Sequence, residues 1–174
     1  MSTRLFSTLT LLLLLSACAH NQRQLTCAER DWYEVGRRDG SQGATLERMN
    51  SYKRDCGGSF DAAWETLYTN GRNAGLVEFC LPENAYELGR MGLSYMNVCP
   101  STMEDEFLLS YRRGQQTRVL QLRAKDLDAK IDSLNQQLLQ THSDSYENRQ
   151  ISTQLTQLKK LRVANERELD RVSK

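Results

Sequence analysis

Tyr33-Glu34-Val35-Gly36-Arg37 returns further along the chain as Tyr86-Glu87-Leu88-Gly89-Arg90, with leucine in place of valine. Each copy begins six residues after a cysteine, Cys27 in the first case and Cys80 in the second. A repeat of this kind indicates that a structural unit has been duplicated, and it has to be interpreted before any other feature of the chain.

A shorter form of the phrase, Tyr-x-x-Gly, occupies residues 68–71 and 111–114. Each of these tyrosines lies twelve residues after a cysteine, Cys56 and Cys99. The order cysteine, Tyr-x-x-Gly, cysteine, Tyr-x-x-Gly therefore occurs twice, and the two halves predict two helical hairpins related by internal pseudo-symmetry. We expect helices over residues 27–40, 59–77 and 82–96, and a fourth from residue 102.

The two halves also align at their helix starts and core positions. Ser59 meets Thr102, where Thr102 with Asp105 predicts a capping box, and Trp64 meets Phe107. The first half carries an insertion between Gly43 and Cys56. Residues 44–58, which contain a pair of glycines, are expected to form a loop, either irregular throughout or with one short turn of helix.

The repeated tyrosines, glycines and arginines are the candidate site residues. Glycine inside a helix costs about 1 kcal/mol relative to alanine, so these glycines need a reason. Close packing of neighbouring helices with the tyrosine ring over the gap is the favoured interpretation, and a ligand that touches the backbone is the alternative. The residues concerned are Tyr33, Gly36, Arg37, Tyr68, Gly71, Arg72, Tyr86, Gly89, Arg90, Tyr111 and Gly114.

The first 17 residues predict a signal peptide, with Arg4 ahead of an apolar run that is too short for a permanent membrane span. The run ends in Leu15-Ser16-Ala17-Cys18, which resembles the cleavage box of bacterial lipoproteins. That resemblance implies that Cys18 carries fatty acyl chains such as palmitate, and that residues 18–26 are a lipidated tether. Ala19 follows the cysteine, which by resemblance to sorted lipoproteins implies the outer membrane and its periplasmic face.

Four cysteines remain after Cys18, namely Cys27, Cys56, Cys80 and Cys99. An even number in an exported chain predicts two disulfides, and four cysteines allow three pairings. Pseudo-symmetry favours pairing within each half. Zinc is the competing interpretation, but none of the cysteine spacings fits a zinc site, so no metal or other cofactor is expected.

The character of the chain changes after Gly114, the last glycine. Apolar residues alternate in steps of four and three from Leu120 to Leu138, and similar steps resume from Ile151, with Arg162 and Asn165 as polar interruptions. A polar break at residues 141–145 separates the two runs. The sequence predicts a duplicated domain over residues 27–115 and a long antiparallel coiled-coil hairpin over residues 116–174. One long helix in an intermolecular coiled coil is the alternative.

The repeated phrase, the stretches Tyr68–Leu76 and Gly89–Tyr95, and the four cysteines resemble a family of proteobacterial lipoproteins catalogued as domain of unknown function 2799. The likeness covers about residues 25–115. It implies an envelope location and an all-α fold stapled by disulfides, and it supplies no catalytic residues.

Composition and motifs favour a binding or structural role over catalysis. The chain from Cys18 on is neutral, because Arg4 is the only charge before it, and no basic stripe indicates nucleic acid. No histidine lies in the motif region, so a Ser-His-Asp triad is excluded there. Glu34, Asp39 and Glu87 are the carboxylates from which an acid pair would have to come, and solvated charges are the favoured interpretation.

We therefore expect a non-enzymatic protein-interaction or scaffold component of the envelope, anchored in the membrane by lipid, with a protein partner on the hairpin. Lys174 resembles the terminal lysine through which the major murein lipoprotein is linked to peptidoglycan, which makes peptidoglycan a further expected partner. The alternative function is a binding protein for a small ligand or peptidoglycan fragment, or a hydrolase, that uses the arginines and glutamates of the repeats.

Overall fold

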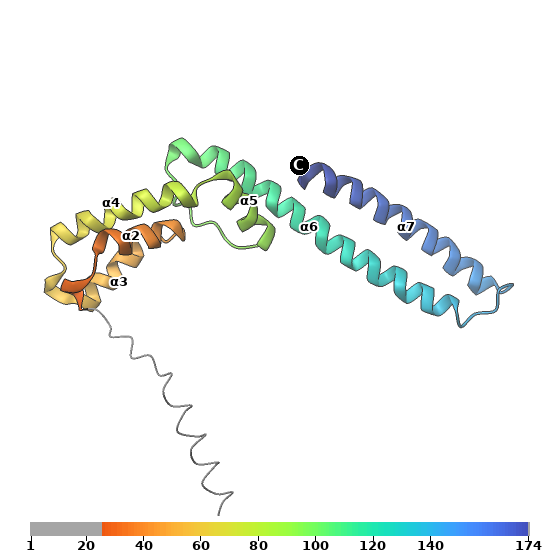
Figure 1. Ribbon diagram of the computed structural model, residues 1–174. Coiled ribbons are helices and arrows are strands. Elements are labelled where there is room, and N and C mark those ends of the chain that lie inside the picture. Colours follow the sequence, from red (N-terminus) through yellow and green to blue (C-terminus); the bar gives the residue numbers. More distant parts are fainter. Residues whose placement is uncertain (1–25, 174) are drawn as a thin grey trace, which may run out of the picture. The chain divides into compact units, whose positions relative to one another are not determined.

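The computed structural model describes residues 26–173, so the predicted signal peptide, Cys18, most of the tether and Lys174 lie outside the described residues. The described chain is all-helical, as predicted, and contains no strand in this range. Figure 1 shows its elements, which are η2 (Cys27–Glu29), α2 (Trp32–Ser41), α3 (Glu47–Cys56), η3 (Gly57–Ser59), α4 (Ala62–Phe79), α5 (Pro82–Met91), α6 (Ser101–Leu138) and α7 (Tyr146–Ser173).

Helices α2 and α4 pack against each other and form the first helical hairpin (Figure 1). Both begin at an aspartate that accepts a hydrogen bond from a backbone N–H of the first turn. Asp31 accepts from Glu34 at 3.1 Å, and Asp61 accepts from Trp64 at 3.0 Å. The start predicted at Ser59 is wrong by one short turn, because the 3₁₀ segment η3 takes up Ser59 and the better cap, Asp61, follows it.

The insertion between α2 and α4 is a helix, and the loop predicted for residues 44–58 is wrong. Helix α3 presents Tyr52 to an aromatic cluster that also includes Trp32 and Phe60. The ring centroids of Trp32 and Phe60 are 4.7 Å apart and those of Trp32 and Tyr52 are 5.5 Å apart, within the range in which aromatic pairs attract. Packing on this cluster stabilises a helix whose own sequence is strongly polar.

Helices α5 and α6 form the second hairpin, and α5 is shorter than predicted. It ends at Met91 instead of residue 96 because Gly92 adopts a left-handed conformation, with φ of +75°. The N–H of Gly92 bonds to the carbonyl of Gly89, and that of Leu93 bonds to Leu88 at 3.0 Å, which closes the helix end.

Helix α6 starts directly after Pro100, and the capping box predicted for Thr102 and Asp105 is absent. It then continues without a break from the second hairpin into the C-terminal hairpin, over 38 residues. The boundary predicted between residues 115 and 116 falls inside this helix. The fourth helix of the repeat and the first helix of the C-terminal hairpin are therefore one element.

Helices α6 and α7 lie side by side and run in opposite directions, as the predicted fold-back requires (Figure 1). Leu120, Ala124 and Leu127 of α6 are buried, as are Ile151 and Leu155 of α7, and all five belong to the predicted apolar runs. The turn between the helices ends at Ser145, whose hydroxyl accepts a hydrogen bond of 3.0 Å from the N–H of Asn148.

The second hairpin has its own core, which surrounds a disulfide. Cys80 bonds to Cys99 across a separation of 19 residues, and both cysteines are buried beside Leu76, Ala85 and Phe107. This bond joins the end of α4 to the start of α6, which is the pairing within one half that pseudo-symmetry favours. Cys27 and Cys56 are also disulfide-bonded, so none of the four cysteines is a free thiol.

Candidate functional site

The glycines of the first two motifs lie where α2 and α4 touch backbone to backbone. A Cβ atom on Gly36 would overlap the carbonyl oxygen of Tyr68, and one on Gly71 would overlap the carbonyl oxygen of Tyr33. The contact is reciprocal, because the glycine of each motif faces the tyrosine carbonyl of the other. Only glycine allows backbones to approach this closely.

The last two motifs repeat the same arrangement between α5 and α6. Gly89 faces the carbonyl of Tyr111, and Gly114 faces the carbonyl of Tyr86. The sequence repeat thus encodes a helix-pairing device, in which Tyr-x-x-Gly on one helix pairs with Tyr-x-x-Gly on the next. Packing between helices accounts for all four of these glycines without a ligand.

The first hairpin is packed closely over a longer stretch than the second. Gly40 faces the carbonyl of Arg72, and Gly75 faces the carbonyl of Arg37, one helical turn beyond the motif glycines. At the corresponding positions the second hairpin has Leu93 and Arg118. Additional glycines in the first half therefore extend the close approach of its two helices.

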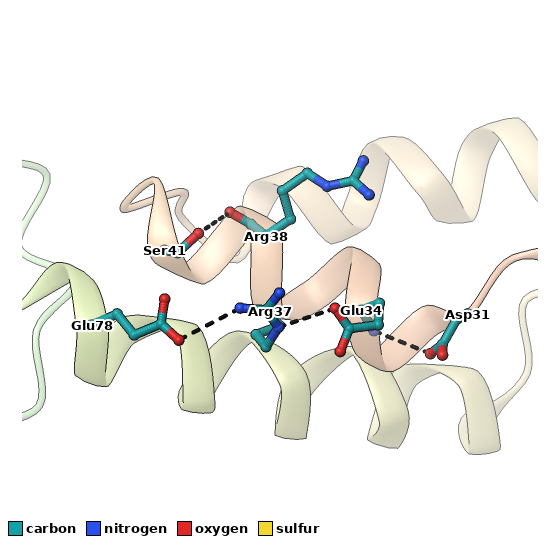
Figure 2. A network of polar contacts seen from close by, with 6 residues as sticks. All are labelled: Asp31, Glu34, Arg37, Arg38, Ser41 and Glu78. Carbon is teal, nitrogen blue, oxygen red and sulfur yellow. Dashed lines mark hydrogen bonds and ion pairs between the residues drawn. The ribbon is translucent and has the colours of Figure 1, made fainter.

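Arg37 is held by two carboxylates on the surface of the first hairpin. Its guanidinium lies 3.0 Å from Glu34 of the same helix and 3.5 Å from Glu78 of α4, as Figure 2 shows. The hydrogen bond and charge of Glu34 raise the pKa of Arg37 above its ordinary value. The same figure shows the Arg38 side chain directed away from this network. Asp31, at the start of α2, accepts a hydrogen bond from the backbone N–H of Glu34.

Arg90 repeats the arrangement in the second hairpin. It donates to both oxygens of Glu87, at 3.1 and 2.9 Å from Nε, so the glutamate and arginine of the five-residue phrase form the same intrahelical pair in both copies. The hydrogen bond from Arg90 lowers the pKa of Glu87, and Glu87 in turn raises the pKa of Arg90. The phrase Tyr-Glu-x-Gly-Arg thus encodes an ion pair as well as a helix contact.

Residues 31–116 match the model of a family described as Protein of unknown function (DUF2799). This part of the chain belongs to the DUF2799 family. The matched range begins at the cap of α2 and ends two residues after Gly114, so it contains all four helix-pairing motifs. Comparison with the curated proteins gives no match, and comparison with the solved structures gives none either.

The DUF2799 region contains one buried polar cluster, and it lies in the first half. Asp39 is 4% exposed, and its carboxylate accepts hydrogen bonds at Oδ2 from Tyr68 at 2.8 Å and from Tyr52 at 3.0 Å. Arg48 approaches the other carboxylate oxygen at 3.9 Å from the solvent side. Burial, together with the bond to Asp39, raises the pKa of both tyrosines.

Arg72 lies beside this cluster and is buried. Its Nε donates a hydrogen bond of 2.8 Å to the carbonyl of Ala44, which fastens the start of the insertion onto α4. Burial lowers the pKa of Arg72. The cluster therefore joins α2, α3 and α4, and its polar groups are occupied by one another.

The remaining tyrosines of the motifs take different partners. Tyr111 donates to the carbonyl of Leu93 at 2.8 Å, and Tyr86 donates to the hydroxyl of Thr117 at 3.3 Å. Tyr33 is 38% exposed. Sequence reasoning found all four tyrosines but missed Tyr52, because its only signal was a single aromatic residue in a polar insertion.

The C-terminal hairpin lies almost wholly outside the DUF2799 match and holds a second polar feature. Asn165 is 4% exposed in the seam, where its Nδ2 donates a hydrogen bond of 2.9 Å to the carbonyl of Leu120. Its Oδ1 is buried and has no hydrogen-bond partner. Arg162, the other polar interruption, pairs with Asp128 across the hairpin at 2.7 Å.

Residues 26–173 contain neither a metal-binding cluster nor a membrane-spanning helix. No group of three or more histidine, cysteine, aspartate or glutamate side chains is arranged to hold a metal ion. None of the helices in that range is both long enough and apolar enough to cross a membrane.

Proposed function

We propose that the protein is a non-catalytic scaffold or interaction component of the cell envelope that presents its C-terminal hairpin to a protein partner. The observation that carries this proposal is the continuity of α6. Phe107 near its start is buried in the core around the Cys80–Cys99 disulfide, and Leu127 is buried in the hairpin seam. One helix of roughly 57 Å thus supports both parts, at 1.5 Å per residue.

The proposed location is the outer membrane, with the protein anchored by lipid on Cys18 and facing the periplasm. Two features support it. The segment that ends in Cys18 resembles a lipoprotein cleavage box, and the four cysteines that follow are disulfide-bonded. Disulfides persist in oxidising compartments such as the periplasm and are rare in the cytosol.

The alternative function, a ligand binder or hydrolase, has less support from the geometry. Arg37 and Arg90 are both occupied by carboxylates of the same protein, and those carboxylates include Glu34 and Glu87. The carboxylate of Asp39 accepts hydrogen bonds from two tyrosine hydroxyls. The groups that a ligand or a catalytic acid pair would need are therefore already engaged in holding the helices together.

The test is cross-linking with mass spectrometry in intact cells, comparing the full chain with a variant that lacks the tip of the hairpin. In this variant a short glycine-serine turn replaces residues 135–154, so that Leu134 leads back to Leu155. The cross-hairpin bonds Asp128–Arg162 and Leu120–Asn165 are retained, and the DUF2799 region is unchanged.

We expect a specific envelope protein to be cross-linked to the full chain and to be lost, or strongly reduced, with the shortened hairpin. If the same partners remain, recognition resides outside the tip and the proposed role of the hairpin is wrong. If no protein is cross-linked to either form, the ligand-binding alternative replaces the scaffold.

A further inference from the structure

The outer face of α7, turned away from α6, carries a basic surface. Thr156, Lys159, Lys160, Val163, Ala164 and Arg167 line one shallow hollow there, and all six are exposed. We call this set the α7 outer face. It spans about 16 Å along the helix, at 1.5 Å per residue.

The three cations of the α7 outer face are not neutralised by the described part of the protein. Lys159, Lys160 and Arg167 form no ion pair with any residue between 26 and 173, whereas most other charges of α7 do. Arg162 pairs with Asp128 and Glu166, and Arg171 pairs with Glu168. None of these acids lines the α7 outer face.

Sequence reasoning missed this surface because the chain is close to neutral overall and α7 contains acids between its cations. Lys160 and Arg167 are seven residues apart and fall on one side of the helix. Glu166 lies at the edge of the face, seven residues from Lys159, and pairs with Arg162, while Glu168 pairs with Arg171. The residues that line the hollow therefore include three cations and no acid.

We propose that the α7 outer face binds an extended polyanion that carries carboxylates, the chemistry of the peptide stems of peptidoglycan. This inference rests on the envelope location proposed above, where such a polymer is present. Charge complementarity selects an anionic partner. The shallow, open form of the hollow suits a chain that lies along the helix, since a small ligand is normally enclosed by a concave pocket.

An anionic membrane surface is the less suitable partner. A helix that lies on a bilayer buries an apolar face among the lipids. In α7 the apolar side is already buried against α6 through Ile151 and Leu155, and the outer face offers only Val163 and Ala164. Electrostatic attraction alone would remain, whereas a carboxylate polymer can approach each cation individually.

The experiment is co-sedimentation of the detergent-solubilised full chain with purified peptidoglycan sacculi, at low and at high salt. The test variant replaces Lys159, Lys160 and Arg167 with glutamine, which removes three charges from an exposed face and retains good helix formers. Three weak surface pairs together predict an affinity loss of about tenfold. Binding of the unmodified chain should also weaken as salt screens the charges.

The matched control replaces three other exposed cations with glutamine, Arg38, Arg54 and Lys125, so that the net charge is the same. The control should bind as the unmodified chain does. Both variants should show the same helix content by circular dichroism, so that a loss of binding is not mistaken for a loss of folding.

The proposal fails if the test variant binds sacculi as well as the unmodified chain does, or if the control loses as much. It also fails if vesicles containing phosphatidylglycerol bind the chain through these residues and sacculi do not. The tip-deleted variant retains all three cations, so it should still bind sacculi. Loss of the protein partner and loss of polymer binding can therefore be observed separately.

Discussion

The hydroxyl of Tyr68 donates a hydrogen bond of 2.8 Å to the carboxylate of Asp39, and both side chains are buried between α2 and α4. The repeat offers an internal comparison, because Tyr111 occupies the corresponding position and donates instead to the carbonyl of Leu93, also at 2.8 Å. The tyrosine hydroxyl at this position of the repeat thus donates its hydrogen bond to a charged acceptor in the first half and to a neutral acceptor in the second.

Replacing Tyr68 with phenylalanine should lower the free energy of unfolding by about 2 kcal/mol, because a hydrogen bond to a buried charge is lost. Replacing Tyr111 with phenylalanine should cost about 1 kcal/mol, the usual value for a neutral pair. Urea unfolding of the two variants measures both. Equal losses would show that the charge of Asp39 adds nothing to the bond.

The same contact predicts how stability depends on pH in the alkaline range. Burial and the bond to Asp39 raise the pKa of Tyr68 above the ordinary value of 10. Above that pH the unfolded chain loses the proton while the folded chain keeps it, so the folded state binds more protons and stability falls as pH rises. Urea midpoints measured between about pH 9 and 11 should fall for the unmodified chain.

The control for this pH effect is the phenylalanine variant of Tyr68, which should show a shallower decline over the same range. Tyr52 shares the acceptor and also has a raised pKa, so part of the slope should remain. Parallel curves for the two proteins would mean that Tyr68 does not contribute to the dependence.

A glycine substitution tests the helix-pairing device. Alanine at Gly36 should gain helix propensity, yet its Cβ would overlap the carbonyl of Tyr68 and come within 2.9 Å of the amide nitrogen of Arg72. Because the obstacle is backbone, we expect a net loss of about 2 kcal/mol or more. The matched control is Gly58→Ala. Apart from its chain neighbours, no atom lies within 4 Å of the position that the added Cβ would occupy, so this variant should change the free energy of unfolding by less than about 0.5 kcal/mol. A neutral Gly36→Ala would contradict the close approach of α2 and α4.

The motifs could be predicted from the sequence, and their reciprocal contact could not. Repeated tyrosines and glycines at one spacing indicated helix pairing, since glycine within a helix needs a reason. The atoms that lie against Gly36 and Gly71 are backbone carbonyls. Every residue has such a carbonyl, so the sequence cannot indicate which one faces which glycine. Only the structure shows which motif pairs with which.

Helix α3 and the unbroken α6 were missed for different physical reasons. Residues 47–56 have only Met49 and Tyr52 as large apolar or aromatic side chains, too few for a helical pattern, and α3 depends on tertiary contacts such as the bond from Tyr52 to Asp39. The change of composition after Gly114 indicated a boundary. Gly114 allows close packing of α6 against α5 and does not end the helix. Further along, α6 packs against α7 instead of α5, while the helix itself continues unchanged.

The disulfide between Cys80 and Cys99 should matter for folding of the second hairpin. Replacing both cysteines with alanine should lower stability by about 3 kcal/mol, since the bond closes a loop of 19 residues. Thermal unfolding with and without a thiol reductant measures the effect. The double variant should still respond to the reductant through Cys27 and Cys56, but by less than the unmodified chain does. An equal response would mean that the bond is not a source of stability.

Asn165 is the residue at which stability and specificity oppose each other. Its buried Oδ1 lacks a partner, and a group in that state usually costs about 1–3 kcal/mol. Leucine at this position should therefore raise the unfolding temperature, as apolar residues do in coiled-coil seams. A buried polar residue in such a seam also fixes register and oligomeric state, so the same variant should associate or populate a second register.

Analytical ultracentrifugation of the full chain in detergent reports association, and a cysteine pair placed across the seam reports register. Arg162→Leu is the matched control, because its charge is already paired with Asp128. A leucine variant of Asn165 that is less stable and keeps a single register would show that the bond to Leu120 outweighs the unpaired oxygen.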